Sequence, residues 1–93
     1  MRSFLYFYYV DYTILKTGHD CQSDDFHLGI VQSTKECAIL CKSTDECLYF
    51  MTDKKGDDQH WDCFWKKMNS SSCIKGWNED KQKNTFELKG MTI

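Results

Sequence analysis

Short apolar runs alternate with polar stretches along this 93-residue chain. Residues 4–15 are mainly aromatic and β-branched, which favours a strand, with Tyr12–Leu15 as its part within the domain. "CLYFM" predicts a buried strand, "WDCFWKK" a strand returning beside it, and "TFELKG" a last strand. The two-residue period of a strand places Cys63 and Trp65 on the same side.

One helix is predicted between the first two of these runs. Ser33 and Glu36 form an S-x-x-E capping box, and the apolar "CAILC" follows directly. The helix is expected over Thr34–Lys42, about two and a half turns, which is too short to be stable without tertiary contacts. The predicted fold class is therefore α+β, with one short helix packed on an antiparallel sheet.

Polar segments connect these elements. Residues 16–25 have the Gly, Asp and Ser content of a loop, and "DKKGDD" predicts a turn centred on Gly56. Residues 69–84 are expected to form a long polar loop. No internal repeat, linker or low-complexity segment interrupts the pattern, so we divide the chain into an N-terminal aromatic extension, 1–11, and one small domain, 12–93.

Composition indicates an oxidising environment. The six cysteines fit three disulfides, as in small secreted or extracellular domains. A net charge of −2 argues against nucleic acid as a partner, and no apolar run approaches the roughly twenty residues of a membrane span.

Arg2 followed by Phe4–Val10 imitates a signal peptide. We do not expect one, because the run is short and aromatic and Asp11 ends it without small residues for cleavage.

The cysteine spacing allows a simple geometric hypothesis. Cys37 and Cys41 are four residues apart, so on a helix they share one face, which can point at the sheet. Spacing alone does not establish the pairing, because six cysteines allow fifteen. One set that fits is Cys37–Cys63, Cys41–Cys47 and Cys21–Cys73. Loop-closure entropy gives about 2.4 kcal/mol for a Cys41–Cys47 bridge and about 3.6 kcal/mol for a Cys37–Cys63 bridge, and nested loops are not additive.

Metal, redox and catalytic interpretations have little support. The Cys37-x3-Cys41 spacing suits zinc loosely, but no second compact pair completes the site, and His19, His27 and His60 are scattered. The C-x-x-C motif of redox proteins is absent, as are G-x-S-x-G and phosphate-binding glycine loops. We expect a protein that is not an enzyme and that holds no metal and no cofactor.

The motifs "C-x3-C-x5-C-LYF", "HWDCFWKK" and the late "TFELKG" together resemble a PAN/apple domain. The resemblance covers residues 12–90. It implies a helix with two cysteines packed on a sheet, the pairs Cys37–Cys63 and Cys41–Cys47, and a non-catalytic module that binds protein or carbohydrate. Apple domains often clamp their termini with an outer disulfide. Here a Cys21–Cys73 bridge would instead tie the loop before the helix to the long loop after Trp65.

Several side chains are candidates for binding or modification. Asn69-Ser70-Ser71 is an N-glycosylation sequon in a polar loop. Trp61 and Trp77 are candidates for stacking on sugar rings or on a partner, although most aromatics of so small a domain belong to its core. Lys54 and Lys55, together with Lys66 and Lys67, could form a basic patch, or a solvated face in which aspartates interleave.

The N-terminal aromatic run is longer than the domain needs. An uncharged aromatic strand can add to the sheet edge of a neighbour, and repeated contacts of this kind give a filament. Candidate assembly residues are Phe4, Tyr6, Tyr8 and Val10.

The leading hypothesis is an extracellular adhesion module for a protein or glycan ligand. The alternative is a self-assembling, glycosylated structural subunit, and a secreted inhibitor or toxin is a third hypothesis without an identifiable reactive loop.

Overall fold

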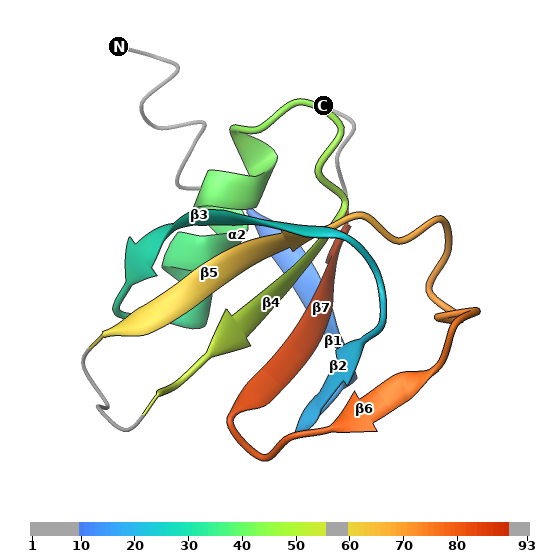
Figure 1. The fold of residues 1–93 in the computed structure, drawn as a ribbon. Coiled ribbons are helices and arrows are strands. Elements are labelled where there is room, and N and C mark those ends of the chain that lie inside the picture. Colours follow the sequence, from blue (N-terminus) through green and yellow to red (C-terminus); the bar gives the residue numbers. More distant parts are fainter. Residues whose placement is uncertain (1–9, 56–59, 90–93) are drawn as a thin grey trace, which may run out of the picture.

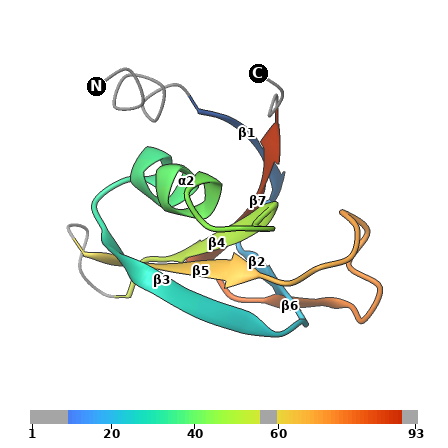
Figure 2. The ribbon, with the colours of Figure 1, turned by 90° about the horizontal axis from the view of Figure 1, so that it is seen from above.

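The computed structural model describes residues 10–55 and 60–89, which form a five-stranded antiparallel sheet with a helix across one face, and a small two-stranded sheet (Figure 1). The strand order in the five-stranded sheet is β1-β7-β4-β5-β3. Its strands are β1 (Asp11–Lys16), β3 (Asp25–Val31), β4 (Tyr49–Asp53), β5 (Trp61–Lys66) and β7 (Lys83–Lys89). The sheet curves around helix α2 (Thr34–Lys42), as Figure 2 shows from above. The α+β class, with one short helix on an antiparallel sheet, is confirmed.

Helix α2 has the bounds that its capping signal predicts. The Ser33 hydroxyl oxygen accepts the Glu36 backbone N–H at 3.2 Å. The Glu36 carboxylate accepts the N–H of Gln32 at 2.8 Å, one residue earlier than the reciprocal bond of a capping box. At the other end, the Ser43 backbone N–H donates to the Ile39 carbonyl at 3.0 Å and closes the last turn.

Three strands lie where no strand was predicted. β2 (His19–Cys21) and β6 (Trp77–Glu79) pair as a second, two-stranded sheet inside segments expected to be loops. They are polar and only three residues long, so they lack an apolar alternation that could reveal them. β3 was not assigned either, because a bulge between His27 and Gly29 interrupts its alternation.

The other predicted elements lie within a few residues of their expected positions. The N-terminal strand includes β1 from Asp11 onward, and residues 4–9 of that prediction lie outside the described residues. β4 begins two residues after Cys47 and extends to Asp53, and the turn expected at Gly56 also lies outside the described residues. Within the described residues no helix is long and apolar enough to cross a membrane.

The core lies between α2 and the sheet. The helix buries Cys37, Ala38 and Cys41 completely. On the sheet, Phe50 and Phe86 stack with ring centroids 5.0 Å apart, and Tyr12 meets both edge-on. Cys63 belongs to this cluster and Trp65 packs against it, so the two share a face as predicted. The disulfides are Cys37–Cys63, Cys41–Cys47 and Cys21–Cys73, the same set proposed from the sequence.

The opposite face of the main sheet carries a buried cation. Lys66 is only 1% exposed, and its ammonium group lies 2.8 Å from Asp20 Oδ1 and 3.2 Å from Asp25 Oδ2. The small sheet approaches this face, where the Thr85 hydroxyl donates to the carbonyl of His19 at 3.0 Å. Lys66 therefore belongs neither to an exposed basic patch nor to a solvated face, and both predictions for it are wrong, because two other strands supply its counter-ions.

We predict that the two carboxylates around Lys66 differ in their contribution to stability. Asp20→Asn removes the nearer and more buried counter-ion of an enclosed charge, while Asp25 remains, and should lower the free energy of unfolding by about 2 kcal/mol, as for the loss of a hydrogen bond to a charged group. Asp25→Asn is the matched control, because its carboxylate is 39% exposed, and should cost less than about 1 kcal/mol. Denaturant unfolding at neutral pH measures both. Equal losses, or a larger loss for Asp25→Asn, would contradict the role assigned to Asp20.

A second charge is buried at the end of β4. Asp53 is 2% exposed, and within residues 10–55 and 60–89 its Oδ1 atom has no hydrogen-bond partner. Its Oδ2 atom lies 3.9 Å from the ammonium group of Lys55. Burial raises the pKa of the Asp53 carboxyl, and the nearby cations Lys83 and Lys55 oppose that shift only in part.

The raised pKa predicts a stability slope with pH. The folded state holds the Asp53 proton more tightly than the unfolded state. The free energy of unfolding therefore falls as pH rises from the ordinary carboxyl pKa, about 3.9, through the raised value. Asp53→Asn should flatten this part of the profile and stabilise the protein at neutral pH. Denaturant unfolding from acidic to neutral pH tests this, with exposed Asp45→Asn as control. An unchanged slope in Asp53→Asn would disprove the assignment.

Candidate functional site

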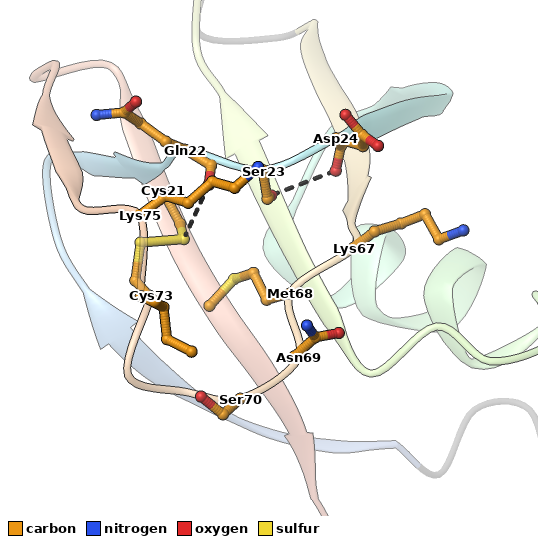
Figure 3. A pocket seen from close by; sticks show the side chains of 11 residues that line it. Cys21, Gln22, Ser23, Asp24, Lys67, Met68, Asn69, Ser70, Cys73 and Lys75 are labelled. Carbon is orange, nitrogen blue, oxygen red and sulfur yellow. Dashed lines mark hydrogen bonds between the residues drawn. A yellow bond between two sulfur atoms is a disulfide. The ribbon is translucent and has the colours of Figure 1, made fainter.

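Two neighbouring hollows share the three residues that follow β5, Lys67–Met68–Asn69, here called the 67–69 segment. The first hollow, of about 220 Å³, lies between this segment, residues 21–24, Ser70 and residues 73–75 (Figure 3). The second, of about 200 Å³, lies between the same segment, the connection from α2 to β4, and the end of β5. The 67–69 segment is thus the border between two concave surfaces.

Backbone hydrogen bonds and a disulfide fix the walls of the first hollow. The Lys67 N–H donates to the carbonyl of Asp24 at 2.9 Å, which joins the 67–69 segment to the chain before β3. Across the hollow, Cys73 is bonded to Cys21, and Met68 points toward this disulfide while the Lys67 side chain extends the other way (Figure 3). The hollow therefore lies between two parts of the chain that are each anchored to the scaffold.

The loop beyond Asn69 is held in an unusual backbone conformation. Cys73 has a φ angle of +50°, in the left-handed region that residues other than glycine seldom adopt. The Gly76 N–H donates to the Cys73 carbonyl at 2.9 Å, and the Gln22 N–H donates to the Gly76 carbonyl at 3.0 Å. These bonds hold Ile74 on the outside of a supported turn, where it is 82% exposed.

Lys67 stacks on two aromatic rings. Its ammonium nitrogen lies 5.5 Å from the ring centroid of Phe26 and 5.4 Å from that of Trp65, and the two rings are 5.3 Å apart. Such cation–π contacts contribute about 0.5–1 kcal/mol at exposed sites. Within the described part of the chain Lys67 forms no ion pair that would neutralise it. The contact orients a cation whose outer side faces solvent.

Exposed apolar side chains gather around the hollows. Five large apolar residues of the described chain are exposed, and three of them line a hollow or contact Lys67: Phe26, Leu48 and Ile74. Amides, hydroxyls and both signs of charge lie beside them. This mixture supplies directed hydrogen bonds and apolar contact together, the combination found in binding sites.

Histidines and acidic residues form no metal centre in the part of the chain that the structure describes: no group of three or more potential ligands lies together there. His27 Nε2 lies 2.8 Å from Asp62 Oδ1, and His19 Nδ1 lies 2.9 Å from the carbonyl of Thr17. Both histidines therefore have local partners on separate strands.

The binding residues chosen from the sequence lie elsewhere. Lys54 and Trp61 meet near the end of the β4–β5 hairpin, with the ammonium nitrogen 5.0 Å from the ring centroid. Lys55 lies beside Asp53, and Trp77, in β6, has Lys16 over its ring at 5.9 Å. None of these four predicted residues lines either hollow, whereas Asn69, the sequon residue, lines both.

The sequence pattern did not single out Phe26, Met68 or Ile74, and it included Lys67 only in a general basic patch. Their grouping depends on the path of the chain from residue 67 to residue 76. The one available signal was the possible Cys21–Cys73 bridge, which brings residues 21–24 to that path. Of the assembly candidates, Val10 packs partly buried against the core, and Phe4, Tyr6 and Tyr8 lie outside the described residues.

No family model, curated protein or solved structure matches the chain. The PAN/apple resemblance therefore stays a prediction from its cysteine and aromatic motifs. The structure by itself establishes a small α+β fold with three disulfides, and these bonds indicate an oxidising environment such as the cell exterior.

Proposed function

We propose that this protein is an extracellular, non-enzymatic recognition module that binds a protein or carbohydrate ligand in adhesion. The observation that supports this most strongly is the pair of hollows meeting at the 67–69 segment, with Lys67 oriented by Phe26 and Trp65. Hydrogen-bonding groups and exposed apolar side chains lie within one surface there. The resemblance to PAN/apple domains leads to the same class of function.

The rigidity of the loops around the first hollow also supports a recognition function. A binding loop that is already ordered loses less conformational entropy when its ligand binds. Here the Cys21–Cys73 disulfide and the hydrogen bonds around Gly76 hold the loop on one side of the first hollow. The Lys67 to Asp24 bond holds the other side. The loops around the first hollow are therefore already ordered before a ligand binds, although the scaffold is small.

The binding test compares two lysines in similar settings. Lys67 and Lys54 both stack on a tryptophan, but only Lys67 borders the hollows. Folded protein that carries no glycan on Asn69 is screened against a glycan array and a panel of displayed extracellular protein domains. For the ligands found, Lys67→Glu should weaken binding about tenfold or more, equivalent to about 1.4 kcal/mol, and Lys54→Glu should leave it unchanged.

The reverse pattern would place recognition at the β4–β5 hairpin and contradict the proposed site. A screen without any ligand, with the protein shown to be folded, would contradict the recognition function itself. Circular dichroism of both variants checks that the substitutions leave the fold intact.

A self-assembling structural subunit is the second candidate function, favoured by the position of β1. This strand is at one edge of the main sheet, β3 is at the other, and the aromatic run Phe4–Val10 leads directly into β1. Both edge strands carry bulges, between Ile14 and Lys16 in β1 and between His27 and Gly29 in β3. Bulges hinder edge pairing, so assembly would have to use the chain before β1.

Truncation tests the assembly function. Removing residues 1–9 deletes the aromatic run and keeps Val10, which packs against the core. If the protein is a filament subunit, light scattering and negative-stain microscopy should show ordered polymers for the native chain and monomers for the truncated one. Replacing Phe4, Tyr6 and Tyr8 by serine keeps the chain at full length but removes the aromatic side chains. This variant should also be monomeric if those side chains cause the assembly. Monomers from the native chain would eliminate this function.

A further inference from the structure

We infer that Asn69 is an N-glycan acceptor and that its glycan covers the two hollows, so that the glycosylated and bare forms present different surfaces. The first part rests on the sequence and the exposure of the loop. The second deepens the proposed function and rests on it, because covering the hollows matters only if they bind.

The sequon is unique in the chain. Asn69-Ser70-Ser71 is the only N-x-S/T sequence among the 93 residues, since Asn78 and Asn84 lack a hydroxyl residue two positions later. Glycan transfer at this asparagine would therefore produce one defined glycoprotein with a single attachment point.

The environment of Asn69 differs from that of the other two asparagines. Asn84 Oδ1 accepts the Gly18 N–H at 2.8 Å, and Asn78 Oδ1 accepts a hydrogen bond from Gln22 Nε2 at 3.3 Å. The Asn69 side chain is exposed and, within residues 10–55 and 60–89, forms no hydrogen bond. Its amide is free to carry a substituent without loss of a structural contact.

The sugar donor for this transfer is a lipid-linked diphospho-oligosaccharide. The amide nitrogen Nδ2 of Asn69 attacks the anomeric carbon of the first sugar and loses one proton. The bond from that carbon to the diphosphate oxygen breaks, and the lipid diphosphate leaves. The three disulfides of this fold indicate an oxidising environment, and the eukaryotic secretory lumen is one that also holds such donors.

The position of Asn69 determines what its glycan would cover. Asn69 lines both hollows, and in the first it lies across from the Cys21–Cys73 disulfide (Figure 3). The first sugar would begin at their common border, next to Lys67. An oligosaccharide of several residues attached there extends over a space of about 220 Å³ on one side and about 200 Å³ on the other.

The acceptor is tested by mass. The full chain is secreted from a eukaryotic host behind an added, cleavable secretion leader, and its intact mass is measured before and after treatment with an N-glycan amidase. We expect the mass of one N-glycan, removed by the enzyme and absent from Asn69→Gln. Ser71→Ala, which keeps Asn69 but removes the hydroxyl of the sequon, should also lack it. A native chain of unmodified mass would overturn the proposal.

The covering is tested without any ligand. Lysine acetylation rates are compared between the glycosylated protein and the protein trimmed to a single sugar. Lys67 and Lys75 line the first hollow and should react severalfold more slowly under the full glycan. Exposed Lys35 on α2 is the control and should react equally in both forms. Equal rates at Lys67 and Lys75 would overturn the covering while leaving the proposed recognition function untouched.

Discussion

The disulfide between Cys37 and Cys63 is the interaction on which the rest of the structure depends. It joins the nine-residue helix α2 to the interior of the sheet, and both cysteines are fully buried. A helix of this length does not persist alone, and the net stability of a whole domain is only about 5–15 kcal/mol. A bridge that contributes about 3.6 kcal/mol through loop closure is large on that scale. The aromatic cluster around Phe50 packs in the same core as the helix that this bridge holds.

A disulfide also holds segments at the surface that would not be ordered alone. Cys21–Cys73 links two polar segments that have too little apolar surface to order themselves, and the three-residue strands β2 and β6 pair beside it. This disulfide holds together two of the segments that form the walls of the first hollow. The buried pair of Lys66 with Asp20 adds an electrostatic connection between the small sheet and the main one. A chain of 93 residues can thereby support a shaped recognition surface without a large core.

The sequence predicted the helix and one fitting set of disulfides, but not the strand pairing or the ion pairs that form between distant segments. The bounds of α2 follow from Ser33 and Glu36, which act within one turn, so the helix could be predicted. β2 and β6 could not, because their pairing depends on residues more than fifty positions apart. Lys66 appeared to be a surface lysine since its carboxylate partners come from other strands. Trp61 and Trp77 are binding candidates by their chemistry alone, whereas the position of the hollows depends on the path of residues 67–76. Asn69 was found because a sequon is a local signal, and it lies at the site.

Disulfide mapping of the native, unreduced protein tests whether Cys37 and Cys63 join the helix to the sheet. Cys37 and Cys41 share one tryptic peptide, so a second cleavage between Ile39 and Leu40, or fragmentation that separates them, must precede mass spectrometry. We predict three linked peptide pairs, Cys37 with Cys63, Cys41 with Cys47 and Cys21 with Cys73. Free thiols, or a bond from Cys37 to any cysteine other than Cys63, would contradict this prediction. A bond from Cys73 to any cysteine other than Cys21 would remove the support for the first hollow.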